Sequence, residues 1–275
     1  MILVDISGIA IANVFTTPEL LEGGLNEKLI KEKILISLLG YKSKFFREYG
    51  DMVICCDGDN NWRKQLFKHY KANRKKDKEF VDWDRLDEIV NSFESDLQGN
   101  FPYRIIKNDN AEADDIIGVL TENFYKDEKV LILSGDKDFF QLHNLKDVKQ
   151  FCPRKKEFLK VEDAGLTLFQ HIVRGDRGDG IPNIRSDSDT FVIKGKRQNT
   201  ISGKMLESYY DDIPEELLEN WIRNRNLISF EYIPKEISSD ILKQFKKPAQ
   251  GTKKKMFNYF AEHDMKEFLG KIERF

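Results

Sequence analysis

The chain has 275 residues, of which 40% are hydrophobic, so it can form one large domain or two of ordinary size around a substantial core. Although 33% of the residues are charged, the net charge at neutral pH is only −2, so a surface that binds nucleic acid has to be local. The longest apolar runs are too short to cross a bilayer, and the first residues resemble a strand, which argues against a membrane or secreted protein.

The first 140 residues alternate between short apolar runs and amphipathic segments. Runs rich in valine and isoleucine, typical of strands buried on both faces of a parallel sheet, occupy residues 2–5, 52–57 and 129–134. Helical patterns accompany them at residues 25–49, 61–76, 82–97 and 112–124. This alternation predicts an α/β fold in which helices flank a mostly parallel central sheet.

The last third of the chain is expected to be helical. Residues 183–203 are polar and loop-like, and no strong strand pattern follows them. Amphipathic patterns predict helices near residues 204–210, 215–230, 238–245 and 254–268. We therefore place a domain boundary near residue 180, with a larger domain over residues 1–180 and a smaller helical domain over residues 181–275.

Nine acidic residues lie in five places along the chain, and three of these places directly follow a predicted strand. The nine are Asp5, Asp57, Glu112, Asp114, Asp115, Asp136, Asp138, Asp176 and Asp179. Ligands of parallel α/β sheets bind beyond the carboxyl ends of the strands, and carboxylates gathered there repel one another unless cations neutralise them. Hard oxygen ligands indicate Mg²⁺, which Mn²⁺ can replace. Two ions about 4 Å apart would activate water against a phosphodiester.

Cysteine and histidine show no pattern of a site. The cysteines Cys55, Cys56 and Cys152 form no CxxC motif, so we expect buried reduced thiols and a cytoplasmic protein, in the host cytoplasm if the chain is viral. The four scattered histidines, His69, His143, His171 and His263, are expected to be ordinary surface or core residues. No P-loop motif and no Ser-His-Asp arrangement competes with metal-assisted hydrolysis.

A basic segment follows the strand that ends at Asp57. Residues 61–76 contain no acidic residue, and aromatic residues are interleaved with the basic ones Arg63, Lys64, Lys68, Lys71, Arg74, Lys75 and Lys76. On a helix, part of this set shares one face with Phe67 and Tyr70, and a purely basic face favours contact with phosphate. Its cations are expected beside the metals, where they offset charge on the transition state. The basic stretches 194–204 and 243–255 are weaker candidates for duplex contacts.

Three motifs carry a resemblance to a known family. They are Glu112-Ala-Asp-Asp-Ile116, Ser134-Gly-Asp-Lys-Asp-Phe-Phe-Gln-Leu142 and Gly175-Asp-Arg-Gly-Asp-Gly-Ile-Pro182. In this order they resemble the 5′-nucleases, which are the flap endonucleases and 5′→3′ exonucleases, over residues 2–184 and more weakly beyond. Trp62-Arg63, Tyr70-Lys-Ala-Asn-Arg74 and Phe230-Glu-Tyr-Ile-Pro234 are most similar to the ribonuclease H branch of T-even phages.

The resemblance implies a PIN-like core with two metal sites. The first site would use Asp5, Asp57, Glu112, Asp114 and Asp136; the second would use Asp138, Asp176 and Asp179, with Asp115 and Asp136 nearby. Asp114 and Asp136 would be catalytic, where ions and substrate come closest. Arg63 and Lys71 match the basic residues that approach the scissile phosphate, on a helical arch expected at about residues 61–97.

The resemblance weakens after Pro182. Most members of the family continue with a glycine-rich helix–hairpin–helix that grips duplex, sometimes through a potassium ion. Residues 183–203 replace it here, which puts the potassium site in doubt, although the domain over residues 181–275 is still expected to contact duplex.

The implied activity is a Mg²⁺-dependent 5′→3′ nuclease acting on RNA/DNA hybrids and nicked or flapped DNA. Its implied role is removal of RNA primers and adjacent DNA in lagging-strand replication, as a monomer, with single-stranded-DNA-binding protein or other replication proteins as candidate partners. Two alternatives remain open: a PIN-like ribonuclease for single-stranded RNA, and a structure-specific DNA-binding protein without catalysis.

Overall fold

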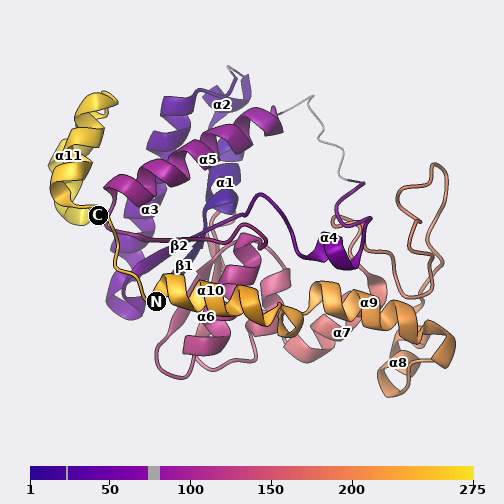
Figure 1. The fold of residues 1–275 in the computed structure, drawn as a ribbon. Coiled ribbons are helices and arrows are strands. Elements are labelled where there is room, and N and C mark those ends of the chain that lie inside the picture. Colours follow the sequence, from indigo (N-terminus) through magenta and orange to yellow (C-terminus); the bar gives the residue numbers. More distant parts are fainter. Residues whose placement is uncertain (23, 74–80) are drawn as a thin grey trace.

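A six-stranded sheet forms the centre of the computed structural model, which describes residues 1–22, 24–73 and 81–275 (Figure 1). The strand order is β3-β2-β1-β4-β5-β6, and all neighbours pair in parallel except β5 and β6. The strands are β1 (Ile2–Asp5), β2 (Met52–Cys56), β3 (Arg104–Lys107), β4 (Val130–Leu133), β5 (Val148–Cys152) and β6 (Glu157–Leu159). This confirms the predicted α/β fold with a mostly parallel sheet.

Helices cover both faces of the sheet, so alternate residues of a strand enter different cores. In β1, Ile2 and Val4 face one core and Leu3 the other. The first core is covered by α1 (Ile6–Thr16), α2 (Pro18–Glu22), α3 (Glu27–Tyr49), α5 (Trp83–Asn100), α11 (Lys253–Glu262) and η4 (Lys266–Arg274). The second is covered by α6 (Ala113–Phe124), η1 (Asp138–Leu142), η3 (Phe230–Tyr232) and α10 (Lys235–Phe245). Burial on both sides explains why the central strands are almost wholly apolar.

A smaller group of elements lies beyond the carboxyl ends of the strands. It consists of α4 (Arg63–Leu66), α7 (Ala164–Arg174), α8 (Gly203–Asp211), η2 (Glu215–Leu217) and α9 (Leu218–Ile228). Two small apolar cores join these elements, one containing Phe67 and Tyr70 with α7 and α9, the other joining α7 to α8. The loop over residues 183–203 projects at the right-hand edge of Figure 1, on the same side as α4.

The expectation of a single helix over residues 61–76 is wrong. Helix α4 ends at Leu66, Phe67 has an extended backbone with φ −143°, and Lys71 has a left-handed φ of 57°. Beyond this break, Phe67 and Tyr70 are buried against α7 and α9. Residues Arg74, Lys75 and Lys76 lie outside the described residues.

The expectation of an arch at residues 61–97 is also wrong for its second half. Helix α5 is a core helix that buries Leu86, Ile89, Phe93 and Leu97 against the sheet. The helical end of the chain is likewise packed on the sheet instead of forming a separate unit: Ile237 and Ile241 of α10 join the core around α6, and Phe260 of α11 joins the core around α5. None of the helices in the described part is both long and apolar enough to span a membrane.

Candidate metal centre and nucleic-acid interface

The first group of acidic residues meets at the carboxyl edge of three neighbouring strands. Asp5 ends β1, Asp57 follows β2, and Asp136 follows β4, and these strands lie side by side in the sheet. Asp57 Oδ1 accepts a hydrogen bond from the Ala113 amide at 2.9 Å, which draws the first turn of α6, with Glu112 and Asp114, to the same edge. The structure therefore brings these five predicted residues together.

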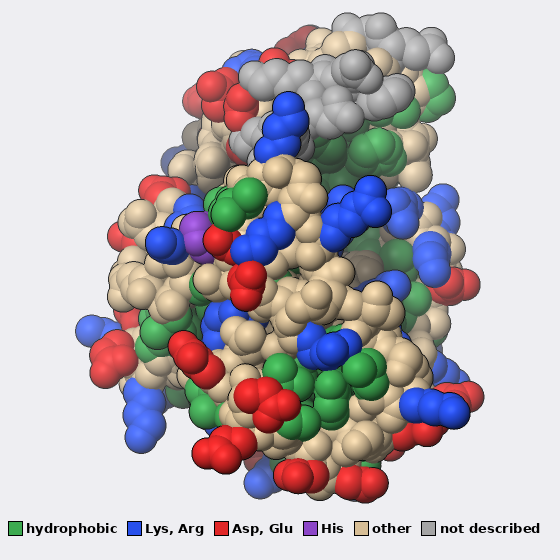
Figure 2. All heavy atoms as spheres, turned by 90° about the vertical axis from the view of Figure 1, so that its right-hand side faces the viewer, with side chains coloured by type: hydrophobic (Ala, Val, Ile, Leu, Met, Phe, Trp, Pro, Cys, Tyr) green, Lys and Arg blue, Asp and Glu red, His purple; other side chains and the backbone are tan. Residues whose placement is uncertain are grey.

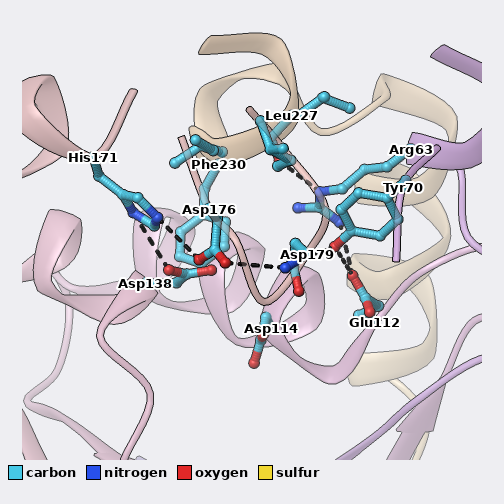
Figure 3. Close-up of a pocket in the computed structure, with 12 residues that line it drawn as sticks. Arg63, Tyr70, Glu112, Asp114, Asp138, His171, Asp176, Asp179, Leu227 and Phe230 are labelled. Carbon is cyan, nitrogen blue, oxygen red and sulfur yellow. Dashed lines mark hydrogen bonds and ion pairs between the residues drawn. The ribbon is translucent and has the colours of Figure 1, made fainter. Parts of the chain in front are cut away.

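The second group lies where η1 meets the loop that follows α7. The Asp179 amide donates to Asp176 Oδ1 at 3.0 Å, which fixes the two carboxylates on one turn. Between Asp138 and Asp176 lies His171, whose Nε2 is 3.1 Å from Asp176 Oδ2 and whose Nδ1 is 3.5 Å from Asp138 Oδ1 (Figure 3). His171, which is expected from the sequence to be an ordinary residue, thus contacts two predicted metal ligands. Its only sequence signal is its position one turn before the Gly175-Asp176 motif.

The basic segment touches both groups through Tyr70 and Lys71. The Tyr70 hydroxyl lies 2.8 Å from Glu112 Oε2 and 2.8 Å from Asp179 Oδ2. Figure 3 shows the Tyr70 side chain directed at Glu112. Lys71 Nζ donates to Glu112 Oε1 and is 3.8 Å from Asp179 Oδ1. The Lys71 amide also donates to the Asp179 carbonyl at 2.7 Å, which holds the left-handed backbone of Lys71. Tyr70, which is expected from the sequence to share a helix face with the basic residues, thus contacts two predicted metal ligands.

Arg63 is buried, although it was expected to approach the scissile phosphate. It is 4% exposed, and its two terminal nitrogens bond Asp115 at 3.0 and 2.7 Å. Trp62 Nε1 donates to the same carboxylate at 3.1 Å, and Asp115 also accepts from the Glu112 amide. Asp115 is fully buried, so this cluster anchors α4 to the start of α6. The geometry does not support Asp115 as a metal ligand or Arg63 as a contact of the scissile phosphate, and we correct both expectations.

The electrostatics of the two groups show an excess of negative charge. Burial, and then the charge of Asp57, raises the pKa of Asp5 to about 6. Burial and the charge of Asp136 raise the pKa of Asp138 to about 7, and the same two causes raise that of Asp114 well above its ordinary value. Burial alone would raise the pKa of Glu112, but the neighbouring cations Lys71 and Arg63 lower this pKa to about 2. Acidic groups crowded without enough cations fit a site for divalent ions.

These shifts predict that the metal-free protein loses stability as the pH rises from about 4 to about 7.5. Folded Asp5 and Asp138 keep protons that the unfolded chain releases near the ordinary pKa of 3.8, so the folded state binds more protons in this window. His171 acts in the same direction, because its pKa is raised and its contribution is lost at higher pH. The pKa of Asp176 is lowered to about 2, so the stability that this carboxylate contributes is complete above about pH 4. It therefore does not oppose the loss of stability at higher pH.

Urea denaturation in EDTA at several pH values measures this effect, and each coupled proton contributes about 1.4 kcal/mol per pH unit to the free energy of unfolding. A saturating divalent ion should flatten the curve. A free energy of unfolding that rises over the window without metal would contradict the prediction.

Of the remaining predicted DNA contacts, the two that lie within the described residues, Lys64 and Lys68, are exposed. Lys64 and Lys68 point to solvent from α4 and the turn after it, as do Lys194 and Arg197 in the projecting loop. Figure 2 shows the face on this side of the molecule, with Lys and Arg side chains across its middle and acidic side chains along its lower edge. The basic surface is therefore local, as the small net charge requires.

A mostly parallel sheet with carboxylates at one edge and a basic segment beside them is the arrangement expected of a 5′→3′ nuclease. Residues 1–166 match the model of the 5′-3′ exonuclease N-terminal resolvase-like domain, and the chain belongs to this 5′-3′ exonuclease and flap endonuclease family. Residues 163–275 match a second model, the C-terminal part of T4 RNase H.

Individual relatives agree with the family. Ribonuclease H of Enterobacteria phage T4 is 29% identical over 294 residues, which cover 99% of this chain and 95% of that protein. A 5′-3′ exonuclease of Buchnera aphidicola is 28% identical over 213 residues, 72% of this chain and 69% of its own length.

Among solved structures, the T5 D15 protein co-crystallised with metal ions has a TM-score of 0.63 at 14% identity, covering 88% of this chain and 98% of that one. The bacteriophage T5 D15 flap endonuclease in a complex with DNA and metal ions has a TM-score of 0.60 at 15% identity, covering 90% and 99%. These likenesses confirm the fold.

Proposed function

We propose that this nuclease uses two Mg²⁺ ions, replaceable by Mn²⁺, to hydrolyse RNA/DNA hybrids and nicked or flapped DNA from a 5′ end. The observation that carries the proposal is the convergence of Asp5, Asp57, Glu112, Asp114 and Asp136 at one sheet edge, beside a second group built on Asp138, Asp176 and Asp179. Bound divalent ions would acidify a water and polarise the phosphate. The crowded donors fit such ions, because nearly all are hard oxygen atoms with unneutralised charge.

The chain's own residues prepare the site for a phosphate. Ser134 Oγ and the Gly8 amide hold the two oxygens of Asp5 at 2.9 and 2.8 Å, and Ser7 Oγ holds Asp57 Oδ2 at 2.9 Å. These hydrogen bonds fix the orientation of both carboxylates. Among the described residues, Lys71 is a half-buried cation that contacts Glu112 of the first group and Asp179 of the second, so it is our candidate for the contact with the scissile phosphate.

The similarity to the phage ribonuclease H supports the proposed role in removing RNA primers and adjacent DNA during lagging-strand replication. We propose that the protein acts as a monomer in the cytoplasm. Its proposed partners are single-stranded-DNA-binding protein or other replication proteins. We further propose that the exposed cations of residues 183–203 contact duplex.

The test is cleavage of a 5′-labelled flap and of an RNA/DNA hybrid, each with Mg²⁺ and with EDTA. We expect cleavage of linear substrates with a free 5′ end, and only with the ion. Equal cleavage in EDTA would overturn the metal requirement. Circular single-stranded RNA cut as fast as linear RNA would favour a PIN-like ribonuclease, and tight flap binding without turnover in Mg²⁺ or Mn²⁺ would favour a DNA-binding protein.

Lys71→Ala should lower the single-turnover cleavage rate by roughly 10²- to 10³-fold and weaken DNA binding much less, because its charge matters most as negative charge builds on the phosphate. Lys68→Ala is the matched control: this exposed cation should lower affinity and reduce the salt dependence by about one counterion. We expect the same of Lys75 and Lys76. Rate and equilibrium binding, measured across a salt series, separate the two outcomes. If the rate loss of Lys71→Ala disappears at saturating enzyme, Lys71 is a steering charge only.

A further inference from the structure

His171 is the nitrogen donor that faces the second acidic group. It lies in the last turn of α7, which places its ring above the loop that carries Asp176 and opposite the start of η1 at Asp138. One ligand atom of each of these three residues lies within 4.8 Å of the others. Figure 3 shows the imidazole directed at both carboxylates from the far side of the pocket.

This spacing suits ligands of one ion. Donor atoms about 2.1 Å from a metal lie about 3 Å apart when they are adjacent and about 4 Å apart when they are opposite. The separation of 3.5 Å between Nδ1 and Asp138 Oδ1 falls in this range. The other nitrogen, Nε2, is 3.1 Å from Asp176 Oδ2. A carboxylate that accepts from the second nitrogen of a metal-bound histidine fixes the orientation of the ring.

The two acidic groups therefore differ in chemistry. Around Asp5 and Asp57, the side chains that donate hydrogen bonds to the carboxylates are the Ser134 and Ser7 hydroxyls, so the donors on this side of the site are oxygen atoms. The second group offers carboxylate oxygen and an imidazole. Mg²⁺ selects oxygen ligands, whereas imidazole strengthens binding of Co²⁺, Zn²⁺ and similar transition ions.

We propose that His171 is a nitrogen ligand at the second metal position, which makes that position prefer a divalent transition ion over Mg²⁺ while the first position remains an oxygen site. The inference rests on the proposed function, because it takes Asp138 to hold a divalent ion. To the proposed function it adds that His171 is a metal ligand and that the ion at the second position is a divalent transition ion.

Metal binding without DNA tests the inference independently of cleavage. Co²⁺ and Mg²⁺ affinities are measured by titration calorimetry for the wild type, His171→Gln and the matched control His263→Gln, which lies in the turn after α11 beside Tyr259. We expect His171→Gln to lower Co²⁺ affinity at one position by at least about tenfold and to change Mg²⁺ affinity by less than about threefold. The control should match the wild type. Unchanged Co²⁺ affinity, or an equal loss for both ions, would overturn the assignment.

A measurement on the wild-type protein avoids dependence on the variant's folding. Electron spin-echo spectroscopy of the Mn²⁺-loaded protein detects a nitrogen bound directly to the ion, and we expect one such nitrogen. Two Mn²⁺ ions with oxygen ligands alone would overturn the inference and leave the proposed function intact. Absence of any bound divalent ion in the wild-type protein would overturn both.

Discussion

Asp114→Asn should lower the cleavage rate by on the order of 10³- to 10⁵-fold while DNA binding survives. Asp114 lies in the first turn of α6 and repels Asp136 and Asp5 of the first group as well as Asp138 of the second. Its charge therefore acts at both metal positions. Asparagine keeps the size of the side chain and removes only the charge, so a loss of this magnitude reports on the ions.

The same substitution should stabilise the metal-free protein. Burial and neighbouring carboxylates raise the pKa of Asp114 well above its ordinary value, so its ionised form destabilises the fold near neutral pH. Removing that charge should raise the free energy of unfolding, and each kcal/mol gained should raise the melting temperature by about 2–4 °C. Divalent ions, which stabilise the wild type by binding it, should have less effect on the variant.

The controls for this prediction use the same chemical change elsewhere. Asp127→Asn, exposed just beyond the other end of α6, should change neither cleavage nor metal response. Asp179→Asn should weaken metal dependence and shift the balance between flap and exonuclease cleavage more than it abolishes cutting. If Asp179→Asn is as inactive as Asp114→Asn, the division into two functional groups is wrong.

Arg63→Ala should destabilise the protein by about 3–5 kcal/mol, because it leaves the Asp115 carboxylate buried without its counter-charge. Asp115 is fully buried and receives both terminal nitrogens of Arg63, and Arg63 Nε also donates to the Leu227 carbonyl at 2.7 Å. The guanidinium thus connects α4, α6 and the end of α9. Urea denaturation measures the loss.

Two further variants show whether the effect belongs to the ion pair. Arg63→Lys should recover only part of the stability, since an ammonium group cannot form the two parallel bonds of the guanidinium. Lys64→Ala removes the adjacent but exposed cation and should change stability by less than about 0.5 kcal/mol. If Arg63→Ala retains full stability and loses only cleavage, then the phosphate contact expected from the sequence is right and the anchoring role is wrong.

The central sheet could be predicted where both faces of a strand are buried. β1, β2 and β4 are apolar throughout and were predicted, whereas β3 (Arg104–Lys107), β5 and β6 lie towards the edges of the sheet, carry polar residues and were missed. Helix α1 was missed because it begins directly after β1, with Asp5 both ending the strand and capping the helix. Helix α7 was also missed.

The acidic site could be predicted because strand ends meet at one edge of the sheet. The positions of the basic side chains around it could not be predicted. The sequence shows that residues 61–76 are basic and does not show which cations are buried. Arg63 is paired in the core and Lys71 faces the acids because Phe67 and Tyr70 turn the chain inward after Leu66. The contact between His171 and Asp138 joins residues 33 positions apart, which no local pattern reveals.

The turn that carries Asp176 and Asp179 is fastened to the base of the basic segment. Lys71 and Tyr70 bond Asp179, Asn73 Nδ2 donates to the Arg177 carbonyl at 2.7 Å, and a Cβ at Gly180 would lie 2.7 Å from Asn73 Oδ1. An ion that stabilises this turn therefore also stabilises the position of Tyr70, Lys71 and Asn73. By thermodynamic linkage the coupling is reciprocal, so a nucleic acid that stabilises the same three residues strengthens ion binding by the same free energy. The affinity for the ion at the second position should therefore be higher when the nucleic-acid substrate is bound.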